Sequence, residues 1–212
     1  MGFRRWVETL LIVLLWGSIR AAGHEAGSAP HFTVLVHNHA DISQAVLEQA
    51  EAEAARVFRA AGIEIVWVDC GTDFGADDPC HDVFRSTYFV LNIVRNGITP
   101  SDFVFGLSFL DESGTGKYSD VFFDRIEEAH RESGANVSRL LGMVAAHELG
   151  HLLLGARAHS YAGIMTAHWK KEDVRHLGMG TLLFTHDQAL VMKARVQEYP
   201  PRLARWELRE GK

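Results

Sequence analysis

The sequence predicts an α+β fold: a twisted β-sheet of mixed strand direction, a helix that backs it, a buried central helix and a C-terminal helix. Segments 31–37 and 87–94 have the apolar pattern of strands, and apolar residues recur at helical spacing over 41–61. The chain has 212 residues, of which 47% are hydrophobic and 23% charged, which suits one globular domain with a substantial core. Its formal net charge of −6 argues against a nucleic-acid partner, which usually requires a basic face.

The first 23 residues have the pattern of a signal peptide. Arg4 and Arg5 form a basic start, an apolar stretch follows over 7–16, and small residues near position 22 offer a cleavage site. The apolar stretch is short for a transmembrane helix, and an uncleaved N-terminal anchor is the alternative. We therefore expect residues 1–23 to direct export and residues 24–212 to form a single secreted or periplasmic domain. A membrane would be a partner only if the first segment stayed uncleaved.

The first half of the chain predicts three strands and one helix. Segment 31–37 alternates as a strand, and the helix over 41–61 starts at Asp41 or Ser43 and stops at Gly62. A second strand is expected over 63–68. Segment 87–94 is almost entirely apolar, which predicts a central strand that is covered on both faces.

Cys70 and Cys80 are the only cysteines and bracket a turn-rich loop. In an exported chain, such a pair indicates a disulfide that stabilises the loop. Free thiols or metal ligands are the alternatives, although the spacing suits no common zinc knuckle.

The second half predicts two strands, over 102–110 and 118–126, joined by a glycine-rich turn. Both could be simply core and edge strands; if one of them lies at the sheet edge beside the next helix, it could pair with an extended peptide. Segment 173–180 looks irregular. Thr185 and Gln188 form a capping box for a last helix over 186–198.

The helix over 138–154 carries the motif around which the chain is organised, His147-Glu148-Leu149-Gly150-His151. Two histidines four residues apart share one helix face, where they can hold one zinc ion, and the Glu between them can reach a water on that ion. The five-residue pattern alone also occurs on helices with two surface histidines. Here aliphatic residues surround it, and burying His and Glu among them is costly unless something binds them.

The segment after the motif also resembles a known family. The metzincin zinc metalloproteases have His-Glu-x-x-His-x-x-Gly-x-x-His and a methionine turn. In this chain the motif is two residues longer, because one residue is added before Gly155 and one between Gly155 and His159. His159-Ser160 with Gly163-Ile164-Met165 is similar to the corresponding region of matrixins. The strong resemblance covers about 20 residues and implies a zincin-like fold.

The resemblance implies a site with one zinc ion, held by His147, His151 and His159. Glu148 would act as the general base, and Met165 would form an apolar floor below the metal. The altered spacing leaves three other candidates for the third ligand, namely Glu172, His168 and His176.

The sequence therefore predicts an exported zinc-dependent endopeptidase that acts as a monomer on a peptide or protein substrate. Two other functions stay open: a zinc-dependent hydrolase of a non-peptide substrate, and a secreted metal-binding domain without catalysis. Zinc content and peptide cleavage distinguish the three.

Overall fold

The computed structural model describes residues 29–70, 80, 88–97, 104–167, 169 and 171–198. The predicted signal segment 1–23 lies outside these residues, and so do the first residues of the strands predicted over 87–94 and 102–110. Within the described part of the chain, no helix is long and apolar enough to cross a membrane.

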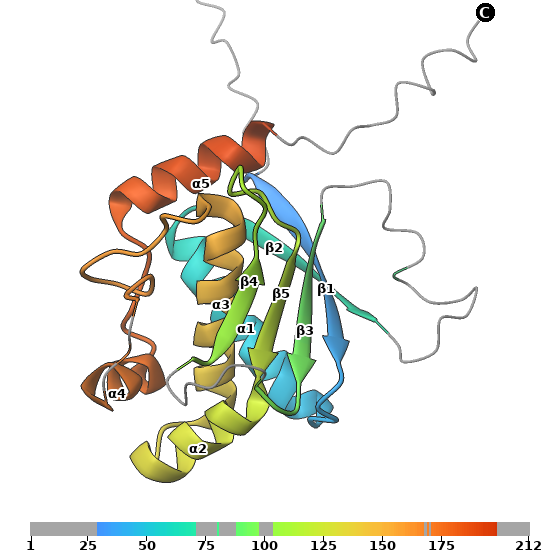
Figure 1. Cartoon of the computed structure of the whole chain (residues 1–212), viewed down its shortest axis with the longest axis vertical. Coiled ribbons are helices and arrows are strands. Elements are labelled where there is room, and N and C mark those ends of the chain that lie inside the picture. Colours follow the sequence, from blue (N-terminus) through green and yellow to red (C-terminus); the bar gives the residue numbers. More distant parts are fainter. Residues whose placement is uncertain are drawn as a thin grey trace, which may run out of the picture.

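Ten elements make up the described part of the fold, five strands and five helices (Figure 1). In chain order they are β1 (His31–Asn38), α1 (Gln44–Ala60), β2 (Glu64–Cys70), β3 (Tyr88–Val94), β4 (Gly106–Phe109), β5 (Tyr118–Phe122), α2 (Phe123–Ser133), α3 (Val137–Leu154), α4 (Lys171–Met179) and α5 (His186–Glu198).

The strands form a mixed sheet in the order β2-β1-β3-β5-β4. β2, β1, β3 and β5 run parallel, and β4 pairs antiparallel with β5 through a hairpin. The predicted mixed sheet is therefore confirmed. β3 lies inside the sheet, as its continuous apolar sequence predicts, and β4 lies at the edge next to α3.

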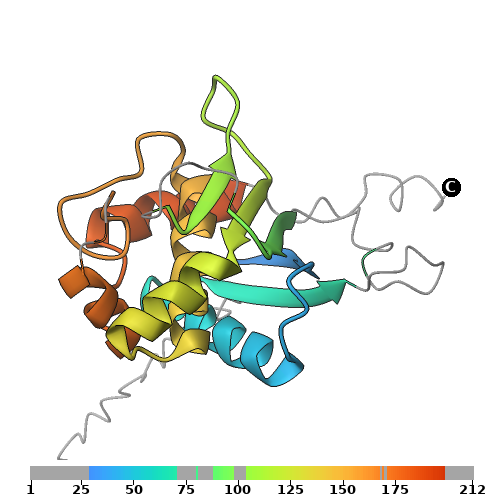
Figure 2. The ribbon, with the colours of Figure 1, turned by 60° about the horizontal axis from the view of Figure 1, so that its bottom comes forward.

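One face of the sheet carries the main core. Phe32, Val34 and Val36 alternate along β1 toward this face, where α1 and α3 pack against them (Figure 2). Leu35 points to the opposite face and packs with Cys80 and Val90 in a smaller cluster. The predicted disulfide between Cys70 and Cys80, with 5.6 Å between their Cα atoms, lies on this second face.

Helix α3 crosses the middle of the main core and is buried almost all round. Gly142 lets it approach α1 closely, because a Cβ at this position would collide with the Ala50 carbonyl. The side chain of Asn136 caps the helix by accepting a hydrogen bond from the Arg139 backbone N–H at 2.9 Å.

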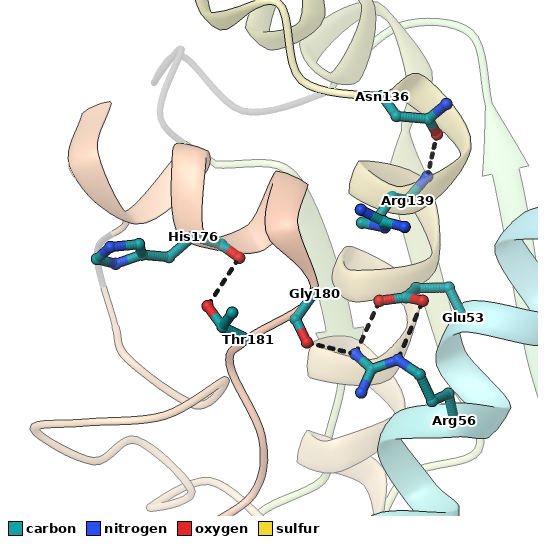
Figure 3. A network of polar contacts seen from close by, with 7 residues as sticks. All are labelled: Glu53, Arg56, Asn136, Arg139, His176, Gly180 and Thr181. Carbon is teal, nitrogen blue, oxygen red and sulfur yellow. Dashed lines mark hydrogen bonds and ion pairs between the residues drawn. The ribbon is translucent and has the colours of Figure 1, made fainter.

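A polar network fixes α1 to the chain after α4 (Figure 3). Arg56 forms a two-pronged ion pair with Glu53 and donates a 2.6 Å hydrogen bond to the Gly180 carbonyl. The chain leaving Gly180 continues to Leu183, whose carbonyl accepts a hydrogen bond from the Ile164 N–H at 3.0 Å. Helix α1 therefore helps to hold the segment on which the methionine turn rests.

Two local expectations are wrong. The predicted strand 118–126 stops at Phe122 and continues as helix α2, which buries Phe123, Ile126 and Ala129 at helical spacing. Segment 173–180 is helical up to Met179 because Val174 and Leu177 pack inward. Ser43 is the N-cap residue of α1, as one of the two predicted starts has it, although its side chain makes no capping hydrogen bond.

Candidate metal centre

Helix α3 places His147, Glu148 and His151 on the side that faces β4. His147 and Glu148 are buried, with 7% and 6% of their surface exposed, and His151 is partly exposed. The fixed geometry of one helical turn brings the two histidine rings within 4.8 Å, centre to centre.

The chain then turns back to deliver His159. Gly155 ends α3 with φ +87° and ψ −169°, so its φ is positive but its ψ is extended rather than that of a left-handed helix. Gln188, buried at the start of α5, donates 3.1 Å hydrogen bonds to the Ala158 carbonyl and the Ser160 hydroxyl. These bonds hold the residues on either side of His159.

His147, His151 and His159 form one cluster whose candidate ligand atoms all lie within 4.8 Å of one another. The His159 ring lies 4.7 Å from that of His151 and 5.7 Å from that of His147. The structure thus brings together the three histidines that the resemblance singles out. Among the described residues, this is the only group of three or more side chains with the ligand types and spacing for a metal.

The chemistry of the cluster suits a cation. A carbonyl can only accept, so the 2.7 Å contact with the Ile164 carbonyl fixes the proton of His147 on Nδ1 and leaves Nε2 with a lone pair. That Nε2 lies 3.2 Å from Nε2 of His151. Burial lowers the pKa of His147 to about 3 and that of His151 to about 4, helped by the neighbouring histidines. Neutral imidazoles with converging lone pairs are the form that binds zinc.

Glu148 points toward the sheet and shares the cleft with the histidines. Its Oε2 accepts a 2.7 Å hydrogen bond from the Ser108 hydroxyl of β4. Burial raises the pKa of Glu148 to about 7, the Ser108 hydrogen bond opposes this, and the negative charge of Asp120 adds to it. A carboxyl group with a pKa near neutrality can both take and release a proton.

Met165 lies within a tightly bonded turn below the helix. The Ser160 N–H donates to the Met165 carbonyl at 2.9 Å. Gly163, with φ +84°, lies so close to Leu183 that a Cβ there would collide with the Leu183 carbonyl. The fully buried Met165 side chain reaches Gly150, where an added Cβ would lie 2.7 Å from its sulfur. A glycine is needed at position 150 because the Met165 turn packs directly against α3 next to His151.

The histidines open into a cleft of about 410 Å³. Its walls are mostly apolar: Trp169 packs edge-on against His147 at 4.9 Å and lies 5.6 Å from Phe105. Strand β4 forms one side through Gly106, Leu107 and Ser108. The cleft therefore joins a candidate metal centre to a sheet edge.

The other ligand candidates lie outside this cluster or outside the described residues. His176 is exposed on α4 and does not belong to the cluster. His168 and the side chain of Glu172 lie outside the described residues.

Two site residues were not predicted as such, Ser108 and Gln188. Ser108 had no local signal, since its partner is 40 residues away. Gln188 was predicted only as a helix-capping residue.

No family model matches the sequence, and no curated protein matches it in a sequence comparison. Solved structures with the same fold do exist. A zinc-dependent peptidase from Methanocorpusculum labreanum superposes with a TM-score of 0.52 and 13% identity, over 76% of this chain and 99% of its own. An archaemetzincin from Methanopyrus kandleri superposes with a TM-score of 0.50 and 12% identity, over 81% of this chain and 98% of its own.

At this level of identity the likeness concerns the fold alone. The chain has the zincin-like fold of zinc-dependent peptidases, as its sequence predicts, and carries a three-histidine cluster that suits zinc. The finer resemblance to matrixins stays a prediction.

Proposed function

We propose that the protein is an exported zinc-dependent endopeptidase. The observation that carries this proposal is the placement of three converging histidines and Glu148 in one cleft beside the edge strand β4. The fold of the zinc-dependent peptidases supports the same reaction class. The basic and apolar start of the sequence and the disulfide between Cys70 and Cys80 support export.

In this proposal His147, His151 and His159 hold one zinc ion. When bound, such an ion supplies Lewis-acid chemistry, because it acidifies water and polarises a carbonyl oxygen. Glu148 accepts a proton from the attacking water and delivers it to the departing amine. The Nδ1–H of His147 stays on the Ile164 carbonyl, which keeps that ring oriented throughout.

The substrate would bind as an extended strand along β4. Within the described part of the chain, β4 pairs with β5 on one side and with no strand on the other. Backbone groups at such an edge can pair with a peptide, while alternate side chains enter neighbouring pockets. The aromatic wall of Phe105 and Trp169 favours an apolar substrate side chain next to the zinc.

Replacing Glu148 tests the reaction. Glu148→Ala should retain about one zinc per chain, because Glu148 is not a ligand, and should lose at least about 100-fold in cleavage of a broad peptide library, since general acid–base catalysis contributes roughly that much. Glu132→Ala, an exposed position on α2, serves as the matched control and should cleave normally.

The outcomes separate the three candidate functions. Peptidase activity retained in Glu148→Ala would contradict the mechanism. Zinc binding without cleavage of any library peptide would favour a non-peptide substrate, and absence of zinc would favour a binding domain without catalysis.

A further inference from the structure

Strand β4 contacts the proposed general base directly. Gly106 and Ser108 are two residues apart and therefore face the same side of the sheet, toward α3. Ser108 is paired in register with Ser119 of β5, which is completely buried. The hydroxyl groups of Ser108 and Ser119 are thus side by side, and that of Ser108 reaches Glu148.

The hydrogen bonds of Ser108 have a definite direction. Its oxygen lies 2.7 Å from Oε2 of Glu148, 2.8 Å from the Glu148 backbone carbonyl and 3.0 Å from the Ser119 hydroxyl. The Glu148 backbone carbonyl and the carboxylate Oε2 are both acceptors, so the single hydroxyl hydrogen of Ser108 is donated to one of them. The Ser119 hydroxyl then donates to Ser108. When Glu148 is ionised, the charge-assisted bond to Oε2 is the stronger choice.

Gly106 provides the space that this arrangement needs. A Cβ at position 106 would lie 2.7 Å from Cγ and 2.8 Å from Oε1 of Glu148, and 2.8 Å from the Asp120 carbonyl. The backbone carbonyl cannot move aside without breaking the strand pairing. The side chain of Glu148 therefore lies in a recess shaped by Gly106 and bounded by Ser108.

We infer that Ser108, oriented by Ser119, is a positioning residue for the Glu148 carboxylate. The inference rests on the proposed role of Glu148 as general base. A Glu side chain on a helix has several rotatable bonds, and its carboxylate can swing away from the reacting water. The hydrogen bond from Ser108 to Oε2 fixes the orientation of the carboxylate, which leaves Oε1 to accept the proton of the attacking water.

Steady-state kinetics of the zinc-loaded full chain tests this role. Ser108→Ala should lower kcat by roughly 10- to 100-fold, as losses of such supporting contacts do, with KM changed much less. Ser108→Thr restores the hydroxyl and should recover most of kcat. Ser113→Ala removes a hydroxyl from the tip of the same hairpin, where it contacts Asp111 and Thr115, and should leave kcat unchanged.

A second measurement does not depend on activity. In urea unfolding of the zinc-free protein, Ser108→Ala should lower the midpoint when Glu148 is present and shift it much less in a Glu148→Ala background. This double-mutant cycle isolates the contact between the two side chains, because the loss of the Ser119 partner occurs in both backgrounds.

The two tests also separate this inference from the proposed function. A wild-type chain that binds zinc but cleaves no peptide would overturn the proposed function, and the unfolding cycle would still decide whether Ser108 holds the carboxylate. Equal midpoint shifts in both backgrounds, or a kcat of Ser108→Ala within about twofold of wild type in an active enzyme, would overturn the positioning role.

Discussion

At the scale of the residue, His147 shows how the chain prepares a metal ligand before any metal binds. Its Nδ1–H donates a hydrogen bond to the Ile164 carbonyl. This one backbone contact fixes the position of the proton, the orientation of the ring and the direction of the Nε2 lone pair. That carbonyl is next to Met165, and the methionine turn and the ligand are therefore parts of one packed unit. Sequence spacing could predict the ligand, but the carbonyl that orients it could only be found in the fold.

A half-buried carboxyl group on α1 carries a prediction on pH. Burial raises the pKa of Glu51 on α1 to about 8 from an ordinary 4.5, with further contributions from a hydrogen bond with Asp69 and from the charges of Asp69 and Glu48. Between these two values the folded chain keeps a proton that the unfolded chain releases. This group therefore lowers stability as pH rises from about 4.5 to 8.

Glu51→Gln removes this titration. Relative to wild type, the variant should gain nothing near pH 4.5 and should gain roughly 1–2 kcal/mol of unfolding free energy at pH 8.5, allowing for the partial exposure of the group. Urea unfolding at several pH values measures the difference, with exposed Glu132→Gln as the control. A difference between Glu51→Gln and wild type that does not vary with pH would contradict the prediction.

At the scale of the element, α5 does more than cover the core. The capping box at its start is present, with Gln188 accepting from the Thr185 N–H at 2.9 Å and donating its own N–H to the Thr185 hydroxyl at 3.3 Å. The amide NH2 group of the same Gln188 holds the loop of His159. The cap at the start of α5 and the position of the His159 loop thus depend on the same side chain.

Substitution of Gln188 should therefore weaken zinc binding, because its amide NH2 group holds Ala158 and Ser160 on either side of His159. Gln188→Leu is expected to lower zinc affinity by roughly 10- to 100-fold, the usual effect of losing a contact that supports a ligand. Thr185→Ala removes the cap but leaves the loop contacts, and should cost about 1 kcal/mol of stability with little change in affinity. Competition with a chelator measures the zinc affinity of each variant, and urea unfolding measures its stability. Equal zinc affinities in the two variants would contradict the role of Gln188 at the His159 loop.

Elements with strong local patterns could be predicted from the sequence, and those defined by distant packing could not. α1, α3, α5 and the sheet strands have clear periodicity and turn residues. The start of α2 is not predicted, because the strand pattern of Tyr118–Phe122 continues into Phe123 and Ile126 without a capping side chain. α4 was missed because its few apolar residues stand among charged ones, and only contact with the core makes it helical.

The candidate site divides in the same way. The motif residues of α3 and the methionine turn are adjacent in sequence, so their pattern can be recognised. Ser108 and Gln188 reach the site from other elements, and neither has a local sequence signal for a role in the site. Only the fold brings their side chains next to Glu148 and the His159 loop.

At the scale of the whole molecule, the sheet separates the candidate metal centre from the disulfide. α1, α3 and the candidate metal centre belong to one face, while Cys70, Cys80, Leu35 and Val90 form a small cluster on the other. The disulfide closes a loop with a sequence separation of 10. It lies in the cluster on the face opposite α1 and α3.

Removing the disulfide should consequently affect stability and spare the site. The paired change Cys70→Ser and Cys80→Ser is expected to lower the unfolding free energy by about 2–3 kcal/mol, the chain-entropy value for a loop of this size. Zinc content and peptide cleavage at 25 °C should stay at wild-type levels. Loss of zinc in a variant that is still folded would show that the two faces are coupled.

The most direct test of the central claim is zinc stoichiometry, measured side by side on the purified wild-type chain and on His159→Ala. The three-histidine site predicts about one zinc per wild-type chain and a large loss in the variant, because a catalytic zinc site needs three protein ligands. One zinc in both proteins would contradict the assignment of His159 and move the third ligand to Glu172, His168 or His176. No zinc in either, after refolding with the metal present, would contradict the metal centre itself.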